Sequence, residues 1–239
     1  MTKRAAVVQS NYIPWKGYFD LINQVDEFVL YDDVQYTRRD WRNRNVIKTP
    51  AGLQWLTIPV EVKGKYHQLI RDTQIAAAGW GKKHWASIAQ NYSRSEHFKD
   101  YRETFEALYA SEYPSLSACN RAFIEAVCRV LGIGSRITWS WEHPVAQGKN
   151  ERLISICQAV DAGIYLSGPA AKGYLDEALF REAGIEVEWM DYSGYPAYRQ
   201  LHGQFEHGVT VLDLLFNEGP DAARYMKTFN RTVTDAAGR

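Results

Sequence analysis

AAVVQSNYIPWKGYFDLINQVDEFVLYDDVQYTRRDWRNRN, residues 5–45, is the stretch that decides the fold. Its first apolar run, 5–8, is short and is followed by turn-forming residues, which is typical of a buried strand that ends in a loop. Apolar residues then recur at helical spacing over 19–25, and a second apolar run, 28–31, ends in the polar residues 32–35. The order strand, loop, helix, strand predicts half of an α/β domain with a doubly wound, mainly parallel sheet.

The same stretch predicts where a ligand binds. In open parallel sheets, ligands bind outside the carboxyl ends of the strands. Residues 9–18 follow the first predicted strand and residues 32–45 follow the second, so both segments are expected at one crevice. We therefore expect the active site there.

The composition is that of a globular protein with a high aromatic content. The chain has 239 residues, 46% hydrophobic and 23% charged, and its formal net charge of zero gives no global attraction to nucleic acid or an anionic membrane. It has no apolar run of about 18 residues and no signal-peptide pattern, so a cytoplasmic protein without a membrane span is expected. Cys119, Cys128 and Cys157 lack metal-ligand spacing and are expected to be reduced. Its 8 Trp and 15 Tyr suit the binding of sugars or bases.

The remaining chain predicts more strands, a helical block and a second strand–loop–helix unit. Strands are expected at 53–60, 137–141, 163–166 and 185–189. Helices are expected at 80–92, 101–109, 116–131, 151–160, 174–183 and 209–216, with a small-residue loop at 167–173 and a frayed tail from Thr232. The expected organisation is a single domain, 1–239, with a helical insertion at about 80–132.

Two adjacent carboxylates, Asp32 and Asp33, follow the second predicted strand. A carboxylate at this position can act as a general base or bind Mg²⁺. Alternatively, one caps the following turn and the other pairs with a neighbouring arginine. Because successive residues of an extended chain point in opposite directions, at most one is expected to be catalytic. Asp33 is the favoured base, and Asp32 is a substrate-binding candidate.

A dense group of cations follows, in a chain whose net charge is zero: Arg38, Arg39, Arg42 and Arg44. Guanidinium groups bind phosphate or carboxylate through two parallel hydrogen bonds, so the group predicts an anionic ligand. The alternative is that some of these arginines pair with acids at the surface. If residues 40–45 are extended, Arg42 and Arg44 lie on one side and Asn43 on the other.

His84 is the second candidate base. It lies four residues after Trp80, and its ordinary pKa near neutrality suits the removal of a proton from an amine or hydroxyl. The alternative is a hydrogen-bonded histidine at the edge of a helix packing face. Neighbouring Lys83 is a substrate-binding candidate.

Ser167 and Gly168, with Lys172 nearby, are typical of an anion-binding turn that opens a helix. The glycine pattern of a nucleophile elbow is missing there, so a Ser-His-Asp hydrolase is not expected. Aromatic and amide groups suited to a sugar or base occur at Tyr12, Trp15, Tyr18, Tyr198 and Gln200, although the same rings can form an aromatic minicore. The other substrate-binding candidates are Gln9, Gln35, Arg38, Asn43 and Tyr174.

Taken together, QSNYIPWKGYF at 9–19, DDVQ at 32–35 and WRNRN at 41–45 resemble the WbqC-like protein family. The resemblance covers nearly the whole chain and continues through WLTIP at 55–59, Trp80 with Lys83 and His84, YLSG at 165–168, Tyr198 with Gln200, and LDLLFN at 212–217. Members of the family often carry Gln-Pro where this chain has Gln9-Ser10.

The resemblance implies a bacterial protein of surface-polysaccharide (O-antigen) biosynthesis that transfers an amino acid such as glycine onto a sugar. We therefore expect a transferase that forms an amide or ester between an activated acyl or aminoacyl donor and a nucleotide-linked or lipid-linked amino sugar. No cofactor or metal is required by the sequence. The donor is expected to be an acyl-CoA, a nucleotide-linked substrate or an acyl or aminoacyl carrier protein, and no nucleic-acid partner is expected. A non-catalytic sugar-binding protein of the same pathway remains open.

A more distant similarity concerns topology. The opening strand, loop, helix and strand are similar to those of the class I synthetase-like nucleotidyltransferases, including pantothenate synthetase. Their loop carries two phosphate-binding histidines, whereas Trp15 and Tyr18 stand at comparable spacing around Gly17 here. The similarity implies a Rossmann-like fold and leaves a nucleotide-dependent ligase as a second alternative.

Overall fold

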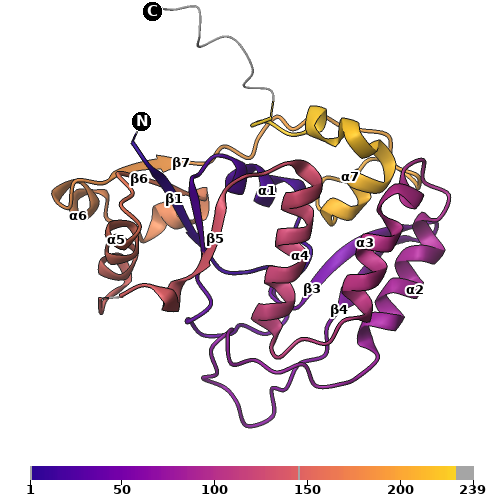
Figure 1. The fold of residues 1–239 in the computed structure, drawn as a ribbon, viewed down its shortest axis with the longest axis horizontal. Helices are drawn as coiled ribbons and strands as arrows, with labels where there is room; N and C mark the ends of the chain where they lie inside the picture. Colours follow the sequence, from indigo (N-terminus) through magenta and orange to yellow (C-terminus); the bar gives the residue numbers. More distant parts are fainter. Residues whose placement is uncertain (1, 145, 230–239) are drawn as a thin grey trace, which may run out of the picture.

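A five-stranded parallel sheet forms the centre of the computed structural model, which describes residues 2–144 and 146–229 (Figure 1). Its strands are β1 (Arg4–Val8), β2 (Glu27–Leu30), β5 (Arg136–Trp139), β6 (Ile164–Ser167) and β7 (Glu186–Trp189). They are arranged in the order β5-β2-β1-β6-β7, and every neighbouring pair is parallel. Counted along the chain, this is the order 3-2-1-4-5 of a Rossmann-like sheet. The predicted α/β, doubly wound class is confirmed.

The direction of chain progression reverses between β1 and β6. From β1 the chain adds β2 and then β5 on one side, and it afterwards adds β6 and β7 on the other side. In such sheets the loops after the two central strands separate and leave a crevice at their carboxyl ends. The loop after β1 therefore lies at the position where a ligand is expected.

Alternate residues of the central strands enter two separate apolar cores. Ala6, Phe28 and Leu30 pack with α1 (Lys16–Asn23) and the helical block, while Val7 and Val29 pack on the opposite face. This alternation follows from the two-residue period of a strand. Because both faces are covered, the strands read as short apolar runs, which is why they were recognisable in the sequence.

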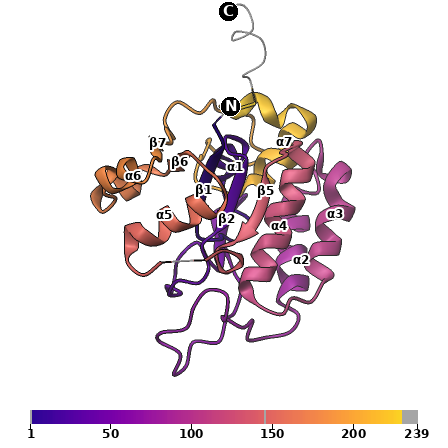
Figure 2. The ribbon, with the colours of Figure 1, turned by 60° about the vertical axis from the view of Figure 1, so that its left-hand side comes forward.

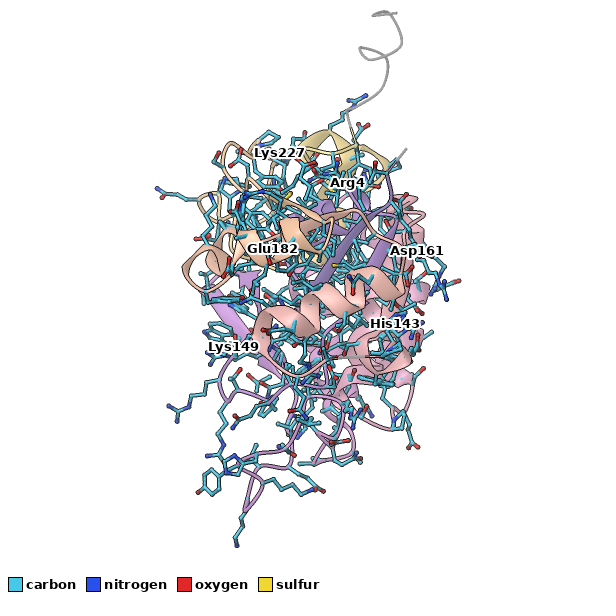
Figure 3. The ribbon with its side chains drawn as sticks, turned by 90° about the vertical axis from the view of Figure 1, so that its left-hand side faces the viewer. Arg4, His143, Lys149, Asp161, Glu182 and Lys227 are labelled. Atoms are coloured by element: carbon cyan, nitrogen blue, oxygen red, sulfur yellow. The ribbon has the colours of Figure 1, made fainter. Side chains whose placement is uncertain are left out.

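Helices cover the two faces unequally (Figures 1 and 2). The larger core includes α2 (Trp80–Tyr92), α3 (Phe98–Ala110), α4 (Leu116–Leu131) and α7 (Val211–Glu218). On the other face, α5 (Lys149–Ala159) crosses the sheet towards Asp161, and α6 (Glu177–Glu182) packs beside it (Figure 3). The expected helical block is thus three consecutive helices, α2 to α4. That it is an insertion into a single domain over 1–239 stays a prediction.

The strand expected at 53–60 does not join the parallel sheet. It is β4 (Gly52–Thr57), paired antiparallel with β3 (Arg44–Thr49) in a separate hairpin that the sequence analysis did not predict. Pro50 and Ala51 form the two-residue turn, and Gly52 takes φ +110°, a value that favours glycine. The short turn fixes antiparallel pairing, since a parallel connection needs a longer crossover.

Several boundaries also differ from expectation. The helix expected at 174–183 is only α6, because a short 3₁₀ helix, Pro169–Gly173, occupies the expected loop and the Asp176 side chain caps α6 by accepting from the Ala178 amide. The strand expected at 137–141 ends at Trp139. The tail expected from Thr232 lies outside the described residues. No helix in the described part of the chain is long and apolar enough to cross a membrane.

Replacement of Gly81 should destabilise the helical block. A Cβ atom there would lie 2.1 Å from the backbone carbonyl oxygen of Tyr109, so α2 and α3 would have to separate. We expect Gly81→Ala to lower the free energy of unfolding by about 1–3 kcal/mol, although alanine favours helices. Chemical denaturation provides the measurement. The control is Gly134→Ala, where no described atom lies within 4 Å of the added Cβ, and a similar loss there would contradict the explanation.

Candidate functional site

The buried Asp32 carboxylate fixes the loop after β1. It accepts hydrogen bonds from the Ser10 amide (2.8 Å) and from the Ser117 hydroxyl of α4 (2.6 Å). Burial raises the pKa of Asp32, and the hydrogen bonds from Ser10 and Ser117 partly oppose the rise. Asp32 is thus placed to hold two elements together, and no face of its carboxylate is open to solvent.

Asp33 lies at the same sheet edge but points elsewhere. Its carboxylate pairs with Arg152 of α5 at 2.5 Å and accepts a hydrogen bond from the Ser140 hydroxyl. The Arg152 guanidinium also lies 5.4 Å from the ring centre of Tyr31. The structure therefore places Asp33 in an ion pair with an arginine, the alternative raised by the sequence. Its catalytic role stays a prediction.

His84 is enclosed by aromatic rings. Its Nδ1 lies 2.8 Å from the Tyr12 hydroxyl, which lies 2.8 Å from the Tyr109 hydroxyl, and only 8% of the His84 side chain surface is exposed. Burial lowers the pKa of His84 to about 4, and a hydrogen bond to the Thr57 backbone opposes this slightly. The ring is thus neutral at pH 7 and positions Tyr12. Lys83 points to solvent on α2.

The arginine group borders the loop after β1. Arg42 donates to the Asn11 side chain and lies 3.5 Å from the Asp40 carboxylate. Arg44 donates to the carbonyl of Arg39, and its guanidinium lies 4.3 Å from the ring centre of Trp55. Each arginine is therefore held in place by a hydrogen bond, Arg42 to Asn11 and Arg44 to the Arg39 carbonyl.

Asn43 and Asn45 are buried and support the backbone. The Asn43 amide donates to the Ile58 carbonyl (2.8 Å), and the Asn45 amide donates to the carbonyls of Tyr12 (2.9 Å) and Ile13 (2.8 Å). Ile13 has φ 36°, an unusual value for a β-branched residue that the double contact from Asn45 helps to hold. These two asparagines therefore support the site by fixing the backbone of neighbouring segments.

A pocket of about 320 Å³ opens where three loops meet, within the size range of small-molecule sites. Its walls come from the loop after β1, from the turn before β3 and from the segment before α7: Asn11, Pro14, Trp15, Trp41, Asn45, His207 and Gly208. Backbone hydrogen bonds join these loops. The Tyr12 amide donates to Trp41, the Val211 amide to Pro14 and the Thr210 amide to Val46, at 2.9–3.0 Å. The pocket is therefore largely preformed.

Trp15 is fixed in position by its neighbours. Its ring centre lies 5.5 Å from that of Tyr192 and 5.4 Å from that of Tyr195. Gly17 allows this placement, because a Cβ atom there would lie 2.3 Å from the indole. Trp15 thus forms a rigid wall of the pocket, and its role in binding a sugar or base stays a prediction.

His207 is the sole titratable side chain among the residues that line the pocket. Its ring stacks edge-to-face on Phe205, with centres 4.5 Å apart. Partial burial and then the nearby Lys16 charge lower the pKa of His207, and Glu206 opposes the change. Lys16 itself is buried against the Tyr195 and Tyr198 rings, and burial lowers its pKa to about 8. His207 is therefore neutral at pH 7 and can accept a proton.

The other predicted residues are spread over several places. Tyr18 donates to the Gln9 carbonyl, and Gln35 donates to the Tyr66 carbonyl on the long loop after β4. Arg38 donates to Val62 on that same loop. Ser167 is buried at the end of β6, and Gly168 lies beside Tyr192.

Two further predictions also lie away from the pocket lining. Tyr174 is exposed near α6, and Gln200 accepts from Lys48 and donates to the Glu206 carbonyl. The structure thus brings only Trp15 of the predicted residues into the pocket lining. Asn11 and Trp41 lie in the segments 9–18 and 32–45 that were expected at one crevice, although neither was named as a site residue. His207 was missed because only long-range backbone contacts bring its segment to the pocket.

The cysteines take no part in the site. Cys119 and Cys128 are buried on α4 and Cys157 is buried on α5. Burial raises the pKa of each thiol, to about 12 for Cys128 and Cys157. They are inert packing residues in this fold.

These features define an α/β protein with a Rossmann-like sheet and a preformed aromatic pocket after its first strand. The chain belongs to the WbqC-like protein family, whose model matches residues 9–225. It is 52% identical over 226 residues to the Mycobacterium tuberculosis (strain ATCC 25618 / H37Rv) protein named "Uncharacterized protein Rv1507c", covering 94% of this chain and 98% of that protein. No solved structure matches the chain. The predicted family is confirmed.

The environment of His84 predicts a pH-dependent stability. Because its pKa falls from 6.5 in the unfolded chain to about 4 in the fold, the unfolded state binds more protons between these values. The stabilisation is complete above pH 6.5 and is lost as the pH falls towards 4. We expect the difference in unfolding free energy between the wild type and His84→Gln to shrink by about 3 kcal/mol over this range.

Urea unfolding at half-unit pH intervals provides this measurement. His67→Gln, which removes an exposed histidine, serves as the control for a change in histidine number. Parallel pH profiles for wild type and His84→Gln would contradict the burial argument.

Proposed function

We propose that the chain is a cytoplasmic transferase of bacterial surface-polysaccharide (O-antigen) biosynthesis that joins an activated acyl or aminoacyl group to an amino sugar. The observation that carries the proposal is the preformed pocket between Trp15 and Trp41. Indole faces pack against the C–H faces of sugar rings, and an amide such as that of Asn11 suits sugar hydroxyls. Family membership supports the pathway.

His207 is the base that the geometry favours. It lines the pocket, its ring is held by Phe205, and it is neutral at pH 7. In the proposed reaction the amine nitrogen, or a hydroxyl oxygen, attacks the acyl carbonyl carbon. The new C–N or C–O bond forms as the bond to the donor's leaving group breaks. The proton passes from the nucleophile to His207 and then to the leaving group.

The sequence-predicted residues keep supporting roles in this proposal. Arg42 and Arg44 would hold an anionic part of donor or acceptor, and the 9–18 loop would orient the sugar. Asp33 and His84 remain candidate bases that compete with His207. The donor is proposed to be an acyl-CoA, a nucleotide-linked acyl group or an acyl or aminoacyl carrier protein.

A second candidate function is sugar binding without catalysis. Two observations favour it: Asp33 is neutralised by Arg152, and His84 is enclosed by aromatic rings. If His207 also proves dispensable, the pocket has no base among its lining residues. Binding and turnover therefore have to be measured separately.

The test compares Trp15→Ala, His207→Gln and Asp33→Asn. Amino-sugar ligands are found by thermal shift, affinities are measured by calorimetry, and the acylated product is quantified by mass spectrometry. We expect Trp15→Ala to weaken sugar binding roughly tenfold. His207→Gln should leave affinity nearly unchanged and reduce turnover at least about a hundredfold. His67→Gln, an exposed site, is the matched control.

Other outcomes separate the alternatives. Full turnover in His207→Gln with loss in Asp33→Asn would return the base to Asp33. Trp15-dependent sugar binding with no product from any donor class would establish a sugar-binding protein. No Trp15-dependent binding of any amino sugar would refute the placement of the site.

A further inference from the structure

Two exposed tryptophans form a platform at the mouth of the pocket. Trp41, which lines the pocket, is 43% exposed, and Trp55 of β4 is 47% exposed. Their ring centres lie 5.4 Å apart, with a tilt of 35° between the planes. Two adjacent exposed rings form a contiguous apolar patch, and such patches can mark ligand-binding surfaces. A ligand in the pocket can therefore extend from Trp41 onto Trp55.

The platform is also cationic. The Arg44 guanidinium lies 4.3 Å from the Trp55 ring centre and forms no ion pair with any described carboxylate. Arg42 beside it lies 3.5 Å from the Asp40 carboxylate, and its charge also opposes the rise that burial causes in the pKa of Asp32. The chain as a whole has a net charge of zero, so this positive charge is a local feature of the platform. It is complementary to an anion at the platform.

We propose that Trp41, Trp55, Arg42 and Arg44 form a subsite for a nucleoside diphosphate, so that the sugar in the pocket is presented as a nucleotide-linked sugar. The nucleobase stacks on Trp55 and the phosphates lie against the two guanidinium groups. This inference rests on the proposed function for the sugar, but not on the transfer chemistry. It selects one of the two acceptor classes, nucleotide-linked over lipid-linked.

The indole rings and the guanidinium groups of the subsite each argue against one simpler ligand. A neutral oligosaccharide would use the indole faces but leave the Arg44 guanidinium charge without a carboxylate or phosphate partner. A lipid diphosphate would use the charges but has no planar ring for the tilted indole pair. A diphosphate joined to a flat aromatic base uses both features, because bases stack on aromatic side chains and phosphates bind guanidinium forks.

The experiment measures binding of UDP, ADP, GDP, CDP and dTDP to the full chain by calorimetry, at two salt concentrations. We expect at least one of them to bind. Trp55→Ala should weaken that binding roughly tenfold, whereas Trp55→Phe, which keeps a stacking face, should retain it within about threefold. Arg44→Gln should weaken binding and reduce its salt dependence, and Arg44→Lys should restore most of the salt dependence.

Matched controls lie elsewhere on the surface. Tyr66→Ala removes another exposed ring, and Arg71→Gln removes an arginine that lies 5.7 Å from the Trp141 ring centre. Neither variant should change nucleotide affinity. Thermal unfolding of every variant excludes global destabilisation as the cause of a loss.

The outcomes distinguish this inference from the transferase proposal. The nucleoside-diphosphate subsite is refuted if none of the five nucleotides binds, or if binding is equal in wild type, Trp55→Ala and Arg44→Gln. Trp55-dependent binding of an isoprenoid diphosphate or of a neutral oligosaccharide, without nucleotide binding, also overturns it. Nucleotide binding that depends on Trp55 and Arg44 while no acylated product forms upholds the subsite and refutes the transferase.

Discussion

The site depends on the hydrogen bonds of one buried carboxylate, that of Asp32, which has no salt-bridge partner among the residues that the structure describes. This carboxylate sits at the end of β2 and takes its hydrogen bonds from the Ser10 amide and the Ser117 hydroxyl. Ser117 in turn accepts from the Trp139 indole at 3.2 Å, and Asn120 of α4 donates to the Ser10 hydroxyl at 2.9 Å. Leaving these donors unpaired inside the protein is costly, so the loop after β1, α4 and the end of β5 are held in one arrangement.

The polar support continues from this point to the pocket. Asn120 also donates to the Arg42 carbonyl, and Asn45 holds the backbone of Tyr12 and Ile13. The Tyr12 hydroxyl is fixed from the other side by His84. The buried residues Asn45 and Asn120 therefore hold the backbone around the few side chains that reach the pocket. Rigid support of this kind is what a binding site requires if its geometry is to be precise.

The fold could be predicted from the sequence because its determinants are local. Apolar runs such as 5–8 and 28–31 predict buried strands. Because a helix is predicted between these two runs, the strands are predicted to be parallel. The hairpin was missed because β3, RNVIKT, shows neither an apolar run nor an alternating pattern, and its buried polar residues Asn45 and Lys48 are satisfied only by distant partners. Only part of the pocket could be predicted from the sequence. Trp15 follows β1 directly, but His207 reaches the same place through backbone contacts some two hundred residues along the chain, which no local pattern reports.

The β3–β4 hairpin is paired with no strand of the main sheet. Its outer strand exposes Leu53 and Trp55, while its inner strand is anchored through Asn45 and Val46. Leu56 of this strand belongs to the larger core, but a change confined to the exposed Leu53 and Trp55 leaves the sheet register and both apolar cores untouched. Within a family that shares one scaffold, this arrangement lets ligand preference diverge by exchange of the exposed side chains of the outer strand, while the buried side chains Ile47 and Leu56 keep the hairpin attached to the core.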